Sequence, residues 1–209
     1  MFLIVPLKEN LHKFKNLFYI CFVELLNPYN MKLELCCSKD LHRPDLGYVK
    51  ITKEVMVATN AHILGVLPTE LLFDEEQVAC IPEEGFLIAA ADFKKLREAL
   101  SRTIEPDGVT IHLRDKKGGL SIIPIATEAT VGKYPNWQGV VPPPDTRQAP
   151  MSEISLNGEL LAKLSQALGD PFLRLQWSAP NRAIYVEPTS EENNPRHFGI
   201  IMPLYNPNA

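Results

Sequence analysis

The sequence divides at residues 134–142, which read YPNWQGVVP. Proline near each end restricts φ and removes an amide donor, so the stretch suits a surface connector better than a central strand. Its Trp and its Val pair would hold a connector against an apolar surface, although an ordinary loop with one packed Trp accounts for the same residues. We favour the connector, because the blocks on its two sides repeat one pattern.

The block that begins at Gly85 predicts a strand, a helix and two further strands. Asp92 is a suitable helix cap, and the apolar residues that follow it recur at helical spacing. The last two strands form a hairpin, because an Asp- and Gly-containing turn stands between them. The expected ranges are 86–90 for the first strand, 93–102 for the helix, and 109–113 and 120–125 for the hairpin.

The block that begins at Glu153 follows the same order. Asn157 caps its helix, and Gly169 stands where a glycine commonly ends one. The apolar residues of the two helices align at a constant offset: Phe93, Leu96, Ala99 and Leu100 with Leu161, Leu164, Ala167 and Leu168. The repeat predicts a duplicated half-domain whose helices cover one side of a sheet. The expected strands are 154–156, 172–177, 182–186 and 198–203.

The earlier part of the chain contains short β-like runs. They predict a meander of strands over 33–35, 48–51, 55–58 and 63–67. Residues 68–84 are expected to be a solvated acidic loop. Residues 1–30 alternate apolar and basic runs. They are either a strand (2–6) and helix (8–26) of the fold or an extension upstream of Met31, and we favour the extension.

Composition limits the function classes. The 209 residues are 45% hydrophobic and 22% charged, which is ordinary for a globular protein. A net charge of -4 gives no general attraction to nucleic acid, so any contact with DNA requires a local basic face. The four cysteines lack metal-ligand spacing and are expected to be reduced, which indicates the cytoplasm. The second apolar run of the N-terminal segment is too short to cross a membrane.

Catalytic motifs are not found in the sequence. Its five histidines are scattered, and none stands at ligand spacing from a Cys or a carboxylate. The sequence has neither a Gly-rich phosphate loop nor a nucleophile elbow. We therefore expect no enzyme activity, no catalytic residue, no metal and no cofactor.

Four stretches resemble the bacterial DNA polymerase III beta subunit, the sliding clamp. RPDLGYV (43–49), VATNAHIL (57–64), the connector and IMPL (201–204) occur in the order of similar stretches in clamps. The likeness covers roughly residues 32–205. It implies an α+β, DNA-clamp-like fold of repeated βαβββ half-domains, with helices on one face of antiparallel sheets.

The chain departs from the family in length, since bacterial clamps have three domains and this chain has about three half-domains. We expect a clamp-like domain over 31–144 and a C-terminal clamp-like half-domain over 145–209. The first half of the 31–144 domain is poor in helix, unless residues 8–26 supply one, and its second half is 85–133. Because of the shorter length and the helix-poor first half, the sequence does not decide whether the chain forms a ring.

The resemblance also implies a binding site. Clamp partners insert a short peptide into an apolar pocket. The matching parts of this chain are the turn within 57–64, the connector and the C-terminal stretch 201–204. Ile63 and Gly139 stand where clamps carry Arg, so this pocket should be less polar. The alternative is that these residues form the core of any β-rich fold. The pocket would comprise Thr59, Ala61, His62, Ile63, Leu64, Pro135, Gly139, Val140, Ile201, Met202, Pro203 and Leu204.

A DNA-facing surface is the second candidate. Basic side chains on the two helices would track phosphates without reading bases. A solvated helix face of mixed charge explains the same residues. The candidates are Lys94, Lys95, Arg97, Arg102 and Lys163.

Two functional hypotheses follow. One is a sliding-clamp-like DNA replication and processivity factor that assembles as a homo-oligomeric ring. It would bind double-stranded DNA without sequence specificity, together with DNA polymerase or other proteins that carry a clamp-binding motif. The other is a peptide-binding adaptor or regulator derived from a clamp, which forms no ring and binds no DNA. Neither hypothesis involves a membrane.

Overall fold

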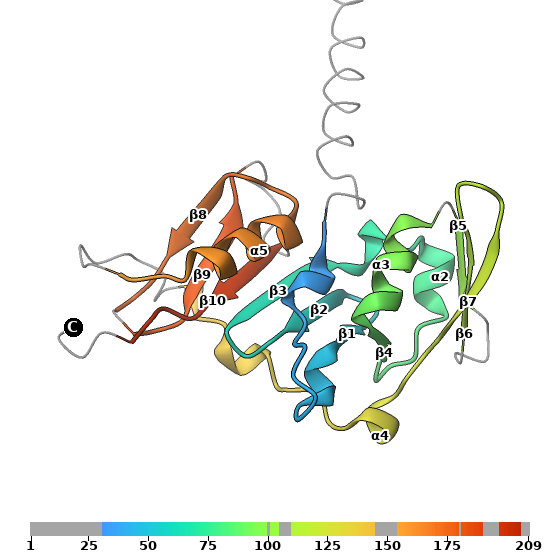
Figure 1. The fold of residues 1–209 in the computed structure, drawn as a ribbon, viewed down its shortest axis with the longest axis horizontal. Helices are drawn as coiled ribbons and strands as arrows, with labels where there is room; N and C mark the ends of the chain where they lie inside the picture. The colour runs from blue at the N-terminus through green and yellow to red at the C-terminus, as the bar shows by residue number, and fades with distance from the viewer. Residues whose placement is uncertain are drawn as a thin grey trace, which may run out of the picture.

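A seven-stranded antiparallel sheet is the centre of the protein, in the order β4-β1-β2-β3-β10-β9-β8 (Figure 1). The computed structural model describes residues 31–99, 101–104, 110–144, 154–179, 181–189 and 197–205. The strands of this sheet are β1 (Tyr48–Ile51), β2 (Val55–Thr59), β3 (Ile63–Pro68), β4 (Phe86–Ala89), β8 (Leu173–Gln176), β9 (Ile184–Pro188) and β10 (Phe198–Ile201).

A second, three-stranded antiparallel sheet follows α3 (Ala90–Glu98) along the chain. It consists of β5 (Ser101–Ile104), β6 (Thr110–Arg114) and β7 (Leu120–Pro124). The middle of the chain is therefore a complete βαβββ unit, β4-α3-β5-β6-β7. The C-terminal unit places α5 (Gly158–Leu168) before β8, β9 and β10, and the N-terminal unit places η1 (Leu33–Cys36), a short 3-10 helix, before β1, β2 and β3. Each unit thus has three strands after its helix.

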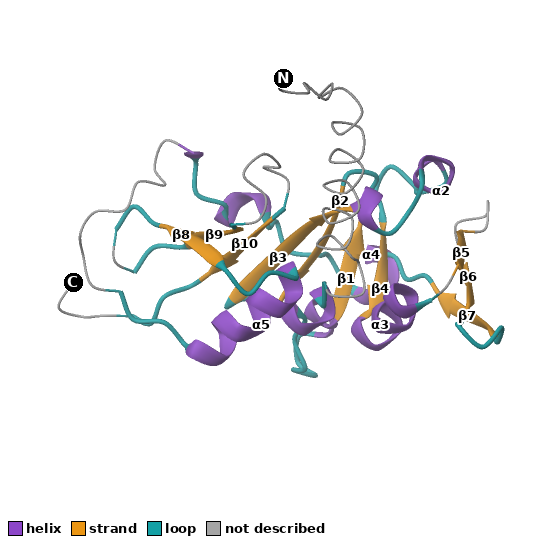
Figure 2. Ribbon diagram, turned by 90° about the horizontal axis from the view of Figure 1, so that it is seen from above, coloured by secondary structure: helices purple, strands orange, loops and turns teal. Residues whose placement is uncertain are grey.

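Helices α3 and α5 lie on one face of the large sheet. Figure 2 shows α3 and α5 on the same side of the strands, and η1 packs against both helices and against β3. Phe93 and Leu96 of α3 share one apolar core with Leu164 of α5 and Leu33 of η1. This is the α+β arrangement that the clamp resemblance implies, and it confirms the predicted fold class.

The sheet continues from the N-terminal unit into the C-terminal unit through β3 and β10. Gly65 of β3 lies opposite Gly199 of β10. A Cβ at Gly65 would stand 2.7 Å from Leu33 Cδ1, and one at Gly199 would stand 2.6 Å from Leu164 Cδ1. The two glycines therefore let η1 and α5 rest directly on the sheet at this junction. The domain division at 144/145 stays a prediction.

The connector covers the opposite face of the sheet. It follows α4 (Glu128–Val131), contains η4 (Gln138–Val140) and runs along the lower side of the molecule toward β9 and β10 (yellow in Figure 1). Tyr134 is buried there in a second apolar cluster with Val57, Val66 and Ile200. Its hydroxyl donates to the Val57 carbonyl oxygen at 3.1 Å. Burial raises the pKa of Tyr134 well above its ordinary value, so the hydroxyl stays a neutral donor.

Several predicted elements were wrong. Residues 33–35 begin η1 instead of a strand, since a helical turn buries Leu33 and Cys36 together. The first helix begins at Ala90, so Asp92 lies within its first turn and does not cap it. The helix ends at Glu98, and Arg102 belongs to β5. Residues 154–156 form no strand.

The acidic stretch 68–84 contains two short helices that the sequence analysis did not predict. These are η3 (Thr69–Leu71) and α2 (Glu75–Ala79). Asp74 caps α2, since its carboxylate accepts from the Gln77 amide at 2.9 Å while the Gln77 side chain bonds back to the Asp74 amide. The predicted N-terminal strand and helix (2–6 and 8–26) and the predicted core residue Leu100 lie outside the described residues.

Candidate functional site

An apolar pocket of about 190 Å³ opens on the connector side of the sheet. The ends of β2, β3 and β10 and the connector surround it. Residues from all three stretches that the clamp resemblance singled out therefore meet at one place. The predicted residues that line it are Thr59, Ala61, His62, Ile63, Leu64, Pro135, Val140 and Met202.

The remaining predicted residues lie outside the pocket. Ile201 is fully buried in the core on the helix side, because side chains alternate along β10 and Ile200 takes the pocket side. Gly139 is exposed in η4, and Leu204 is 53% exposed beyond the end of β10. Pro203 does not line the pocket either.

The structure adds lining residues that the sequence analysis missed. Two of them stand in the RPDLGYV stretch and two in the connector, so the resemblance could have identified them. Ile200 was missed because its neighbour Ile201 was assigned to the pocket, and alternation along a strand would then turn Ile200 toward the core. These residues are Arg43, Leu46, Asn136, Trp137 and Ile200.

A tight turn between β2 and β3 forms one wall. The Thr59 hydroxyl donates to the Ile63 carbonyl oxygen at 2.7 Å and accepts from the Ala61 amide at 3.1 Å. The Asn60 side-chain oxygen accepts from the amides of His62 and Ile63, both at 3.0 Å. Ala61 has φ = 74°, a left-handed conformation that is unusual for a residue with a Cβ. These bonds fix the direction in which His62 leaves the turn.

The C-terminal stretch is fastened to the same turn. The Met202 amide donates to the His62 carbonyl oxygen at 2.9 Å, so the chain after β10 stays beside the pocket. Leu46 and Leu64 are buried beneath it, whereas Met202 is 39% exposed and Val140 50% exposed at its edge. A buried apolar floor with a flexible thioether at its edge suits an aliphatic side chain from a partner.

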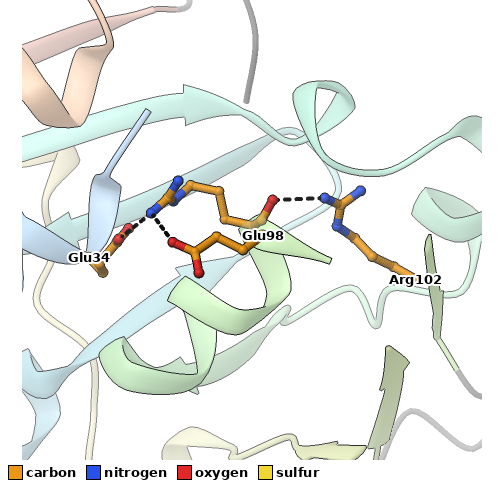
Figure 3. A network of polar contacts seen from close by, with 4 residues as sticks. Glu34, Glu98 and Arg102 are labelled. Atoms are coloured by element: carbon orange, nitrogen blue, oxygen red, sulfur yellow. Dashed lines mark hydrogen bonds and ion pairs between the residues drawn. The ribbon is translucent and has the colours of Figure 1, made fainter. Parts of the chain in front are cut away.

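Only part of the predicted DNA-facing set reaches solvent. Lys94, Lys95 and Lys163 are exposed, and Lys95 pairs with Asp92 at 2.7 Å. Arg97 is buried, where its guanidinium pairs with Glu34 at 2.9 Å and Glu98 at 3.3 Å (Figure 3). The expectation that Arg97 faces DNA was therefore wrong.

Arg102 also differs from the expectation. Its guanidinium donates to main-chain oxygens at the end of α3, and Nε lies 2.7 Å from the Leu96 oxygen. One Nη lies 3.1 Å from the Arg97 oxygen (Figure 3). Carbonyls in the last turn of a helix lack the amide four residues on as a partner, and a cation complements the negative end of the helix. The Arg102 side chain thus caps the C-terminal end of α3 and is held there by these hydrogen bonds.

Among the residues that the structure describes, no group of three His, Cys, Asp or Glu side chains is placed to hold a metal ion. Burial raises the pKa of Cys37 to about 12 and that of Cys36 further, so both thiols stay protonated. Within the same residues, no helix has the length and apolar character needed to cross a membrane.

Comparison with known proteins identifies the fold. No protein-family model and no curated protein sequence matches this chain. Solved sliding clamps do match in structure. The beta sliding clamp of C. crescentus, whose structure holds PEG, aligns over 88% of this chain with a TM-score of 0.60 and 15% identity. The DNA polymerase III beta subunit of Thermotoga maritima aligns over 88% with a TM-score of 0.59 and 12% identity.

A third similar structure is the Bartonella birtlesii sliding clamp bound to griselimycin, with a TM-score of 0.58 and 14% identity over 87% of this chain. The alignments cover 63% to 64% of the three clamps, so this chain spans less than two thirds of their length. Sequence identity this low establishes shared architecture alone. The chain has the fold of the bacterial DNA polymerase III beta sliding clamps, in a shortened form.

Proposed function

We propose that this protein is a sliding-clamp-like replication and processivity factor, without enzyme activity, that binds short peptides of partner proteins in its apolar pocket. The observation that carries the proposal is that one pocket is built from the turn 59–64, the connector and Met202. These stretches are far apart in sequence, and each resembles the corresponding stretch of clamps. A DNA polymerase or another protein with a clamp-binding motif is the proposed partner.

The chemistry of the pocket supports an apolar peptide anchor. Leu46 and Leu64 give a floor without charge, and Trp137 adds a large apolar wall. Aromatic and aliphatic walls around a small pocket are the usual setting for an anchor side chain that carries much of the binding energy. His62 and Asn136 add polar groups that would orient the peptide main chain.

Met202→Ala tests this proposal. Met202 lines the pocket and is 39% exposed, so its truncation should leave the fold intact. We expect the variant to bind a fluorescently labelled clamp-motif peptide more weakly by about 1–2 kcal/mol, the range of a moderate hot spot. Fluorescence anisotropy titration measures the affinity, and thermal melting checks the fold.

Leu204→Ala is the matched control. Leu204 is 53% exposed, lies two residues farther along the chain and does not line the pocket. We expect its peptide affinity to equal that of the wild type. Equal binding by the Met202 variant, or loss of its fold in place of its affinity, would show that the pocket does not receive the peptide.

The proposed role includes assembly around double-stranded DNA in the cytoplasm. A bacterial clamp ring has about twelve half-domains, so a chain with about three would need about four copies to close one. Light scattering of the full chain at high concentration tests this point. A stable monomer that still binds the peptide would favour the adaptor over the ring.

A further inference from the structure

A second hollow adjoins the apolar pocket. Its volume is about 460 Å³, and it shares Arg43, Leu46, Ala61 and His62 with the apolar pocket. Beyond these shared residues it extends along the loop that follows η1 and reaches Lys163 on α5. A ligand that fills the apolar pocket would therefore meet this hollow as it passes His62.

The charge of the second hollow differs from that of the first. Lys39, Arg43 and Lys163 line it, and in the described part of the chain none of the three takes part in an ion pair. Of its two carboxylates, Glu34 is already paired with buried Arg97 at 2.9 Å. Asp40 is exposed, and one of its oxygens accepts from the His42 amide at 2.9 Å. The hollow thus presents an excess of positive charge.

The cations come from separate elements. Lys39 and Arg43 stand on the loop between η1 and η2 (Pro44–Gly47), and Lys163 projects from α5. The loop is folded on itself, because the Ser38 amide donates to the Leu46 carbonyl oxygen at 2.8 Å and the Arg43 amide to that of Asp40 at 3.2 Å. An incoming anion would face positive charge from two walls.

We propose that the two hollows hold one peptide, with an apolar residue in the first and an aspartate or glutamate in the second. This inference rests on the proposed peptide-binding function and specifies its ligand. Charge complementarity supplies the reason: a carboxylate would meet Lys39 and Lys163 on one side and Arg43 at the junction with the apolar pocket. The partner's binding segment is therefore acidic beside its apolar anchor.

A DNA phosphate is the competing anion, because Lys163 is also a candidate DNA contact. The geometry favours the peptide, since the cationic hollow shares four lining residues with an apolar pocket that a phosphate backbone cannot use. Lys94 and Lys95, by contrast, line neither hollow. The experiment includes an arm that separates the two ligands.

The test uses two synthetic peptides with the same apolar anchor, one with Asp and Glu beside it and one with Asn and Gln. We expect the full-length protein to bind the acidic peptide about tenfold more tightly in low salt, the size expected when a few partly exposed ion pairs add. The preference should shrink as salt is raised. In the double variant Lys39→Gln, Lys163→Gln most of this preference should be lost, because only Arg43 is left to meet the carboxylate, while the affinity for the amide peptide should equal that of the wild type.

Lys117→Gln is the control, because Lys117 is exposed in the β6–β7 turn and lines neither hollow. It should keep the full preference for the acidic peptide. If wild-type protein binds both peptides equally, this inference is wrong while the apolar pocket stands. If it binds neither, the proposed function fails as well. If the double variant keeps the preference but loses affinity for a DNA duplex, the hollow serves phosphates and the inference is overturned.

Discussion

Ala61 departs more clearly from the backbone conformation usual for its type than any other residue that the structure describes. It sits at φ = 74° in the turn that walls the apolar pocket. The left-handed conformation costs a residue with a Cβ roughly 1–2 kcal/mol, and the surrounding bonds from Thr59 and Asn60 offset that cost. The turn therefore keeps its shape in spite of its sequence.

Ala61→Gly should stabilise the protein. Glycine removes the steric cost but loses roughly 0.5–1 kcal/mol more backbone entropy on folding, so we expect a net gain of about 0.5–1 kcal/mol. Urea denaturation of the two proteins measures the free energy of unfolding. Ala58→Gly is the contrasting variant, because Ala58 is fully buried in β2 with ordinary backbone angles and should be destabilised. A loss of stability at both positions would contradict this account of the turn.

At the scale of elements, α5 shows what the sequence could predict. In the sequence, Asn157 and Gly169 flank a run of apolar residues at helical spacing. The structure has a helix over Gly158–Leu168, and the Asn157 side-chain oxygen accepts a hydrogen bond from the Glu159 amide at 2.9 Å. Local caps and local periodicity are sufficient for such an element. Strands β1, β2, β3, β6, β7, β8, β9 and β10 overlap their predicted ranges for the same reason.

The errors occur where distant contacts decide the structure. The helix α3 was predicted to continue to Arg102, but β5 pairs with β6, and the Arg102 guanidinium bonds back to the end of the helix. The η1 segment is helical because it fills the space between α3 and α5, which its own sequence does not reveal. The resemblance was sufficient to assign the turn and the connector to the candidate site. It could not reveal the second hollow, because that hollow depends on Lys163, which only the fold brings near Lys39.

The β3–β10 junction makes a prediction about packing between elements. Gly199 lies between Leu64 and Leu164, and an added Cβ would stand 3.0 Å from the Leu64 oxygen and 2.6 Å from Leu164 Cδ1. The leucine can move, but the main-chain oxygen cannot. We expect Gly199→Ala to lower the free energy of unfolding by about 1–3 kcal/mol, as overpacking does.

Gly158→Ala is the matched control for this substitution. Gly158 begins α5, and nothing lies within 4 Å of where its Cβ would stand. Alanine there should leave stability unchanged or raise it by up to about 1 kcal/mol. Chemical denaturation of both variants decides the matter. Equal stability of the two variants would mean that α5 does not rest on the sheet as described.

At the scale of the whole molecule, each of the two sheets has edge strands that pair on one side only within the described part of the chain. Strand β8 is one edge of the large sheet and β7 is one edge of the small sheet. Exposed apolar residues accompany both edges: Leu120 and Ile122 on β7, and Phe172 directly before β8. Strand edges with exposed apolar side chains are surfaces on which chains associate. Head-to-tail contact between unlike edges closes a ring when the rotation per copy allows it.

In the proposed ring, the face of the large sheet that α3 and α5 cover would point toward DNA. The last prediction concerns the basic residues on this helix face. The net charge of -4 opposes general binding to DNA, so retention must depend on local cations. With Arg97 and Arg102 committed to internal contacts, Lys94 and Lys95 are the exposed candidates on α3. Changing both to Glu should weaken retention on a circular duplex and reduce the salt dependence of binding, by roughly 0.9 in log–log slope for each lost phosphate contact.

Gel filtration with a labelled plasmid, across a salt series, measures that retention. Lys117→Glu with Lys133→Glu makes the same charge change on exposed residues outside α3, in the β6–β7 turn and just after α4, so it should bind as the wild type does. A ring should also be lost from the same plasmid once it is cut, because a linear duplex lets it slide off. If cutting changes nothing and both double variants behave alike, the protein does not encircle DNA, and the helix face is an ordinary solvated surface.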